Sequence, residues 1–146
     1  MSHVNETRAG GWRTLAALHT RIEDEIERAL QREHGLAVNE FCALHHLSKP
    51  DARDVRMQQL ASVLVLSQSA TTRLVGRLEE RGLVRRVLSS EDRRGIVAEA
   101  TDEGRALMIR ATPTHNAALD EALAGAAGLP ELKPLVTAIE SIGGKA

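Results

Sequence analysis

Apolar residues recur every three or four positions from residue 12 to about residue 33, and this spacing predicts a long amphipathic helix. Gly35 ends it, as a left-handed cap residue would. Residues 1–10 are polar and are expected to be frayed. A helix of this length exceeds what a small globular head requires, so we expect it to offer a surface to a partner. Its inward residues are Leu15, Leu18, Ile22, Ile26 and Leu30.

Two shorter helices follow. The first is predicted over residues 40–48, and Pro50 ends it, because the residue before a proline is pushed out of the α region. Residues 51–55 are predicted to form a polar connector. The second helix runs from residue 56 or 57 to about residue 65. Its inward residues are Leu60, Ala61 and Leu64, and the small Ala61 suits a close helix crossing.

The next helix is predicted over residues 68–81. The Ser67 hydroxyl can cap its free N–H groups, and Gly82 can end it. An inward stripe of Ala70, Leu74 and Leu78 leaves the polar residues outside. Short polar residues in the first turn, followed by arginines, suit a helix whose N-terminal end enters a major groove. The residues expected outside are Gln68, Ser69, Thr71, Thr72, Arg73 and Arg77.

Two β-like runs, residues 83–88 and 96–100, flank a turn-forming charged segment and predict a hairpin with a charged tip. Thr101 caps the following helix. Pro113 is expected to kink that helix or break it, and residues 125–128 to interrupt it. A last helix is predicted from about residue 130 to residue 142. Helix, helix and hairpin in this order outline a winged helix-turn-helix. The predicted fold class is mostly α (α+β), with a small β-hairpin wing.

Composition limits the core and the compartment. Trp12 and Phe41 are the only aromatic residues and there is no tyrosine, so the core must be aliphatic. The single cysteine, Cys42, excludes an intrachain disulfide and fits a reducing compartment. No signal peptide is recognisable and no apolar run approaches the ~20 residues of a membrane span. We expect a cytoplasmic protein.

Charge is unevenly distributed. The chain has a formal net charge of −1, whereas residues 53–94 hold nine arginines against five acidic residues and carry +4. A locally basic segment in an otherwise acidic chain is a plausible phosphate-facing surface. The signal is weak by itself, because basic helices are usually only solvated faces.

The segment LASVLVLSQSATTRLVGRLEERGLVRR, followed by DRRGIVAEATDEG, resembles the MarR family of bacterial transcription regulators. The most specific part is Asp92-Arg93-Arg94, spaced before Thr101 as in the family's DxR…LT-x-x-G signature. Ala100 stands where the family usually has leucine. The family's threonine before the second helix is absent, since Ala37 and its neighbours stand there, and this puts the start of that helix in doubt.

The resemblance implies a single MarR-like domain over residues 1–146. It would have a DNA-binding head at residues 37–100 and a helical dimerisation region at residues 11–36 and 101–146. It implies a homodimer that binds double-stranded DNA at a pseudo-palindromic operator, with half-sites about one helical turn, ~10 bp, apart. Family members commonly repress genes and release DNA when a small, often phenolic or aromatic, ligand binds between head and dimer region.

The resemblance also assigns DNA contacts to the recognition helix and the wing. Arg73 or Arg77 can read a guanine bidentately, Arg94 is expected in the adjacent minor groove, and Asp92 is expected to hold that arginine. Arg81 has a plainer interpretation, as a solvated side chain or a partner of nearby glutamates, and Arg85 and Arg86 stay open. The predicted DNA-binding residues are Ser67, Gln68, Ser69, Thr71, Thr72, Arg73, Arg77, Arg93 and Arg94.

For the effector site we single out Trp12, His19, Phe41 and His45. Trp12 has two interpretations: it covers the dimer core, or it lines a ligand pocket, as a tryptophan does in urate-responsive relatives. Cys42 suggests a redox sensor, but a buried inert thiol is favoured. His45 and His46 point about 100° apart on a helix, which disfavours a shared metal.

A ligand-responsive DNA-binding repressor is favoured, without metal or cofactor. The alternatives are a redox- or metal-responsive regulator of the same fold, and a winged-helix module that binds proteins instead of DNA. No spaced carboxylate pair, phosphate loop or catalytic triad supports an enzyme.

Overall fold

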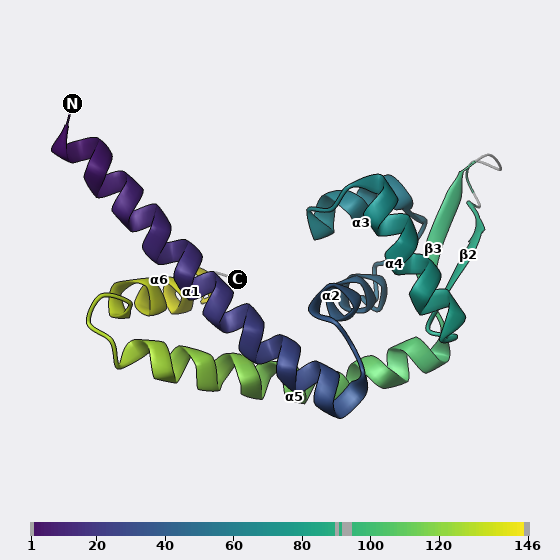
Figure 1. The fold of residues 1–146 in the computed structure, drawn as a ribbon. Helices are drawn as coiled ribbons and strands as arrows, with labels where there is room; N and C mark the ends of the chain where they lie inside the picture. Colours follow the sequence, from purple (N-terminus) through teal and green to yellow (C-terminus); the bar gives the residue numbers. More distant parts are fainter. Residues whose placement is uncertain (1, 90, 92–94, 145–146) are drawn as a thin grey trace. The chain divides into compact units, whose positions relative to one another are not determined.

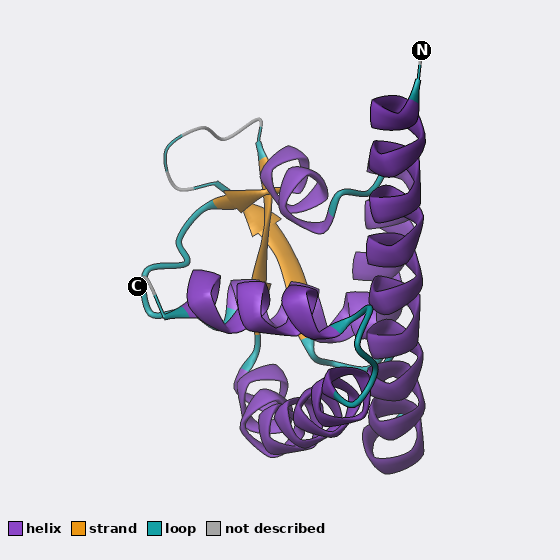
Figure 2. Ribbon diagram, turned by 90° about the vertical axis from the view of Figure 1, so that its left-hand side faces the viewer, coloured by secondary structure: helices purple, strands orange, loops and turns teal. Residues whose placement is uncertain are grey.

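The computed structural model describes residues 2–89, 91 and 95–144 and contains helices and one small antiparallel sheet (Figures 1 and 2). Two compact units divide the chain: residues 30–113, and residues 1–29 together with 114–146. The unit that contains the predicted head is therefore larger than residues 37–100. It takes in the last turn of one helix and the first turns of another.

The unit of residues 30–113 holds the head. Its elements are the end of α1 (His3–His34), α2 (Val38–Leu47), β1 (Val55–Arg56), α3 (Met57–Leu64), α4 (Gln68–Glu80), β2 (Val84–Leu88), β3 (Ile96–Ala100) and the start of α5 (Asp102–Ala127). Helix α2 begins two residues earlier than predicted. The missing threonine cap is replaced in part by Glu40, whose carboxylate accepts the Ala37 N–H at 2.8 Å.

The sheet, orange in Figure 2, has three strands in the order β1-β3-β2. The predicted hairpin is present, with Val84 opposite Ala100 and Leu88 opposite Ile96. Residues 51–55 do not all form a connector, because Val55 and Arg56 pair with Ala98 and Val97 of β3. A strand of two residues is too short to produce an alternating pattern in the sequence.

The core of this unit is aliphatic, as composition requires. Leucines from α1, α2, α3 and α4 are fully buried, among them Leu30, Leu44, Leu60, Leu74 and Leu78. Burial of each such side chain stabilises the fold by roughly 1.5–3 kcal/mol. The two helices of the helix-turn-helix, α3 and α4, thus share a buried core with α1 and α2.

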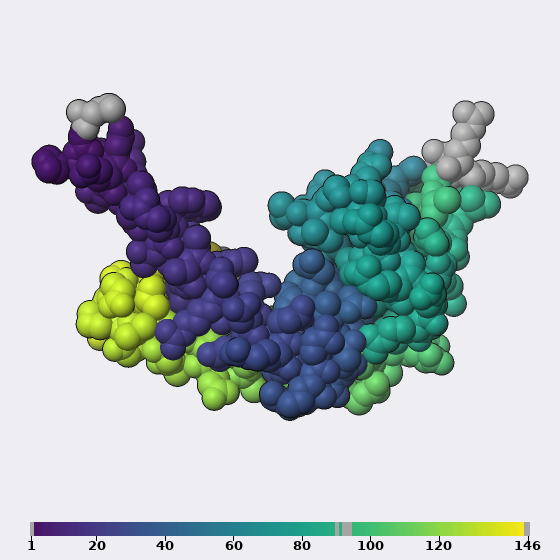
Figure 3. All heavy atoms as spheres, viewed as in Figure 1, coloured from purple at the N-terminus to yellow at the C-terminus, as the bar shows by residue number. Residues whose placement is uncertain are grey.

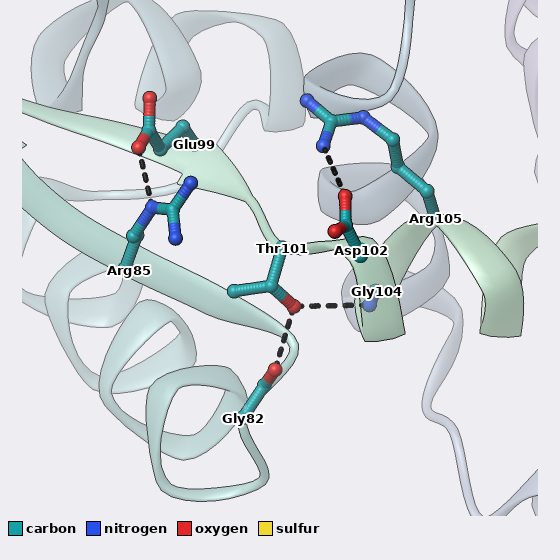
Figure 4. Close-up of polar contacts among 7 residues, drawn as sticks. All are labelled: Gly82, Arg85, Glu99, Thr101, Asp102, Gly104 and Arg105. Carbon is teal, nitrogen blue, oxygen red and sulfur yellow. Dashed lines mark hydrogen bonds and ion pairs between the residues drawn. The ribbon is translucent and has the colours of Figure 1, made fainter.

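The junction between wing and α5 is fixed by one threonine (Figure 4). The Thr101 hydroxyl accepts the Gly104 N–H at 3.1 Å and donates to the Gly82 carbonyl at 2.6 Å. It therefore caps α5, as predicted, and also ties it to the end of α4. Gly104 must lack a side chain here, because a Cβ would strike the carbonyl oxygen of Leu83.

The second unit contains α1 up to residue 29, the second half of α5, and α6 (Lys133–Gly143). Leu18 of α1, Ala126 of α5 and two α6-side residues, Leu132 and Val136, form its buried cluster. No helix among the described residues is long and apolar enough to cross a bilayer.

Several predicted helix ends are wrong. Residues 3–10 are helical and not frayed. The sequence did not indicate this, because a helical extension that buries no face has no periodic pattern of apolar residues. Helix α5 runs unbroken through Pro113 and Gly125 to Ala127. One missing backbone hydrogen bond does not end a helix whose Ala111 and Ala118 are buried on either side. Helix α6 begins at Lys133, later than predicted.

Candidate nucleic-acid interface

The turn between α3 and α4 sets the start of the candidate recognition helix. Val65 adopts a left-handed conformation (φ 55°) after α3, and the Leu66 N–H returns to the Ala61 carbonyl at 3.0 Å. The Ser67 hydroxyl then accepts the Ala70 N–H at 3.1 Å. Ser67 is therefore the N-cap of α4, as predicted.

The outer face of α4 is polar and open to solvent. Exposed polar side chains lie at its N-terminal end, and two arginines follow one helical turn apart. The side chains of Arg73 and Arg77 have no hydrogen bond or ion pair with any described residue. In the space-filling view, the atoms of α3 and α4 reach solvent on the head (Figure 3). We call this the outer face: Ser67, Gln68, Ser69, Thr72, Arg73 and Arg77.

The predicted position of Thr71 on the outside of the helix is wrong. Thr71 is 0 % exposed, and its hydroxyl donates to the Ser67 carbonyl at 2.9 Å. With Leu74, Val75 and Leu78 it forms the buried stripe of α4, while Ala70 is only half-buried. A threonine whose hydroxyl bonds the carbonyl four residues earlier can pack like a small apolar residue. Thr71 therefore cannot contact DNA.

Three described arginines that follow α4 in the chain, Arg81, Arg85 and Arg86, are bonded within the unit of residues 30–113. The Arg81 guanidinium donates to the carbonyls of Gly35 at 2.9 Å and His34 at 3.3 Å, at the C-terminal end of α1. Of the two plainer interpretations of Arg81, the pairing with a nearby glutamate is wrong; the side chain is exposed, as the other interpretation expects, but it bonds backbone carbonyls. A cation at a helix C-terminus meets unpaired carbonyls and the negative end of the dipole.

Arg85 and Arg86 pair with glutamates. Arg85 donates to Glu99, its cross-strand partner (Figure 4). Arg86 reaches back to Glu79 of α4, with two nitrogens at 2.8 and 3.1 Å from one carboxylate oxygen. That hydrogen bond holds the pKa of Glu79 below its ordinary value. Arg85 therefore links the two strands of the hairpin, and Arg86 links the hairpin to α4.

The wing tip was predicted to carry Asp92, Arg93 and Arg94, and these three residues lie outside the described part of the structure. Strands β2 and β3, which lead to this tip, are described. At the tip end of their pairing, the Ser89 N–H donates a hydrogen bond to the Gly95 carbonyl at 2.8 Å.

The four predicted effector-site residues fall in both units. Two of them, Trp12 and His19, belong to the unit of residues 1–29 and 114–146, and Trp12 is 69 % exposed. Phe41 and His45 stack on α2, with ring centroids 6.0 Å apart. His45 also faces an open pocket of about 380 Å³ between α2 and α5. Sequence reasoning missed the rest of its lining: Ser48, Lys49, Pro50, Arg105, Met108, Ile109 and Thr112.

Ser48, one of the residues that line this pocket, has a hydroxyl that is buried without a hydrogen-bond partner among the described residues. A buried hydroxyl left unpaired costs roughly 1–3 kcal/mol. Cys42, expected to be buried, is only half-buried. No group of three or more His, Cys, Asp or Glu side chains that could hold a metal is found in the described ranges.

A capped helix-turn-helix, backed by a three-stranded sheet whose hairpin follows the second helix, defines a winged-helix DNA-binding regulator. Comparison with known proteins agrees. Residues 34–95 match the family model described as MarR family. The transcriptional regulator MhqR of Bacillus subtilis (strain 168) is 31% identical over 107 residues, which span 73% of this chain and 72% of MhqR. The chain belongs to the MarR family and is a transcriptional regulator, not an enzyme.

Solved structures show the same fold. Sco3205 of Streptomyces coelicolor, a MarR family regulator in complex with DNA, aligns with a TM-score of 0.75 at 30% identity, covering 99% of this chain and 88% of Sco3205. CouR of Rhodococcus jostii RHA1, bound to p-coumaroyl-CoA, aligns with a TM-score of 0.69 at 30% identity, covering 91% of each chain. The winged-helix fold predicted from the sequence is confirmed.

Proposed function

We propose that the protein is a homodimeric repressor that binds a pseudo-palindromic operator and releases it when a small ligand binds. The observation that carries the DNA-binding part is the outer face of α4. Its arginines are exposed and unpaired in the described structure, so they can meet DNA without losing internal contacts. The complex of Sco3205 with DNA supports the same use of the fold.

In this proposal the short side chains of the outer face contact base edges and phosphates, and Arg73 or Arg77 reads a guanine. Each good bidentate contact contributes roughly 1–3 kcal/mol of discrimination. Arg94 enters the minor groove next to the major groove that α4 occupies, and Arg93 is a further DNA contact. Asp92 holds Arg94 in place. A carboxylate that faced the phosphates directly would repel them, which is why Asp92 is assigned the supporting role.

The dimer is proposed on the apolar side chains that the second unit leaves exposed. Trp12 is 69 %, Leu15 42 %, Ile139 38 % and Ile142 73 % exposed. Exposed apolar side chains on α1 and α6 are typical of a surface that pairs with a partner. A second copy of the chain is the partner that a pseudo-palindromic operator requires, because two-fold symmetric half-sites need two heads.

The ligand is proposed to be a small aromatic acid or its thioester, bound in the pocket between α2 and α5. Its lining combines apolar side chains, Pro50, Met108 and Ile109, with the positive charges of Lys49 and Arg105 and the ring of His45. Such a set suits an aromatic body with a negatively charged end. The complex of CouR with p-coumaroyl-CoA supports ligands of this class.

The test begins with DNA duplexes recovered by the purified protein from a random pool. Arg94→Ala should bind the recovered duplex roughly tenfold more weakly and flatten the dependence of affinity on salt by about one unit of slope, with the dimer intact. Unchanged affinity and slope would remove Arg94 from the interface. If wild type recovers no duplex, or its binding is indifferent to salt, a protein-binding module becomes the better assignment.

Ligand release is tested in the same assay. Aromatic acids and their coenzyme A thioesters are added to the preformed complex, and the fraction of bound duplex is measured. The proposal requires release by at least one of them from wild type, and weaker release from Arg105→Ala. Repression is tested by a reporter placed behind the recovered sequence: higher expression without the protein supports a repressor, and lower expression an activator.

A further inference from the structure

Gly95 opens the last strand of the wing, and its backbone does not require a glycine. Among the described glycines only Gly35 and Gly82 have positive φ. What Gly95 provides is space. A Cβ there would lie 3.0 Å from Cζ and 3.3 Å from Nη2 of Arg56, and closer still to Nη1. Real Cβ atoms essentially never come as close as the Nη1 position, so a side chain at Gly95 would displace the Arg56 guanidinium, which is the movable end of a flexible side chain.

Arg56 is itself held at a junction. It belongs to β1 and is paired with Val97 of β3. It also precedes α3, and its N–H donates to the Gln59 side-chain oxygen at 2.9 Å. The side chain that covers Gly95 therefore starts where the helix-turn-helix begins.

A second link joins the same two segments. The Ser89 side chain, in a residue only 3 % exposed, donates to the Asp54 carboxylate at 3.4 Å and accepts the Glu91 N–H at 3.2 Å. Asp54 lies two residues before Arg56, and Ser89 bonds Gly95 through the backbone. Ser89 and Gly95, which flank the wing tip, thus both contact residues 54–56.

We propose that Arg56 and Gly95 form a joint that fixes the root of the wing to the start of the helix-turn-helix, and that Arg56 is a positioning residue for DNA binding. The inference rests on the proposed function. A two-stranded hairpin is marginally stable by itself, so its direction depends on what holds its root. A planar guanidinium packed against a backbone that carries no side chain restricts that direction more than the compact, flexibly attached ammonium of a lysine would.

The joint can be tested with a double-mutant cycle on the full-length protein and the duplex recovered by wild type. Arg56→Ala removes the guanidinium, and Gly95→Ala displaces it while keeping its charge. Each should weaken binding roughly tenfold, the loss expected for one misplaced groove contact. The variant with both substitutions should bind no more weakly than Arg56→Ala, because Gly95 acts only through Arg56. Arg56→Lys should stay close to Arg56→Ala.

Two further readouts separate positioning from folding. Hydroxyl-radical footprints of both single variants should lose protection of the deoxyriboses along the minor groove beside the half-sites, whereas dimethyl sulfate footprints should keep protection of guanine N7 in the major groove. Thermal unfolding should stay at the wild-type temperature. Matched controls are Arg110→Ala, an exposed arginine of α5, and Gly10→Ala, where a Cβ meets nothing within 4 Å. Both should bind like wild type.

Three results would overturn the joint. The first is wild-type affinity in both single variants, and the second is losses that add in the double variant. The third is a lowered unfolding temperature with all protection lost, which would make Arg56 merely structural. If wild type itself recovers no duplex, the proposed function fails first, and the role of the joint in DNA binding fails with it.

Discussion

Two groups of arginines within one basic segment have opposite surroundings. On the outer face of α4, Arg73 and Arg77 project into solvent without a partner among the described residues. Beyond the C-terminal end of the same helix, Arg81 bonds the end of α1, Arg85 bonds Glu99 and Arg86 bonds Glu79. Sequence distance between the groups is only a few residues. The comparison shows that charge in the sequence does not tell which cations are available to a nucleic acid.

The difference follows from hydrogen-bond accounting. A guanidinium already bonded to carbonyls or a carboxylate must give up those bonds to meet a phosphate, and its net gain is small. An unpaired guanidinium exchanges only water and gains the release of condensed counterions from DNA. Arg73 and Arg77 are therefore expected to act in binding, and the other three in stability.

The largest expected effect is on DNA affinity. Arg73→Ala and Arg77→Ala should each weaken binding to the recovered duplex by about 1–3 kcal/mol if they read a base, and lower the salt slope by about one if they meet a phosphate. Titrations at several salt concentrations measure both. Arg85→Ala and Arg86→Ala are the matched controls and should change affinity little. Equal losses in all four variants would erase the proposed distinction.

A smaller effect is expected for Arg81, and on a different quantity. Arg81→Ala removes two hydrogen bonds to carbonyls at the end of α1 and should lower the free energy of unfolding by about 1 kcal/mol. Urea unfolding measures this. Arg110→Ala, an exposed arginine without a bonded carbonyl in the described structure, is the control. A weaker DNA complex with unchanged stability would move Arg81 into the first group.

Local signals predicted much of this fold from the sequence. Ser67 and Gly82 mark the ends of α4 through capping chemistry that acts over three or four residues. Thr101 was found for the same reason. The wing hairpin was predicted because turn formers separate two β-like runs.

What the sequence did not reveal depends on tertiary contacts. Thr71 is buried because the neighbours of α4 cover the side of the helix on which it lies, and its hydroxyl is satisfied within the helix. Arg81 finds carbonyls 46 and 47 residues earlier in the chain. The space above Gly95 is filled from a strand of two residues. None of these partners produces a period or motif that a local pattern can detect.

The smallest expected effect concerns the Arg86–Glu79 pair and depends on pH. The hydrogen bond from Arg86 holds the pKa of Glu79 below its ordinary value of 4.5 in the folded state. Because the folded-state pKa is depressed, the contribution of Glu79 to stability is fully present above the unfolded-state pKa, and it is lost as the pH falls through the folded-state pKa. Urea unfolding of wild type and Glu79→Gln should therefore differ by a constant amount above about pH 5, and the difference should shrink as the pH falls below 4.5.

Glu80→Gln is the matched control for that pH series, since Glu80 is an exposed neighbour with no bonded arginine in the described structure. Its difference from wild type should stay near zero across the range. If Glu79→Gln also shows no pH-dependent difference, the pair contributes nothing to stability. Arg86 would then be energetically as available to DNA as Arg73 and Arg77, and bonding geometry alone would not separate the two groups of arginines.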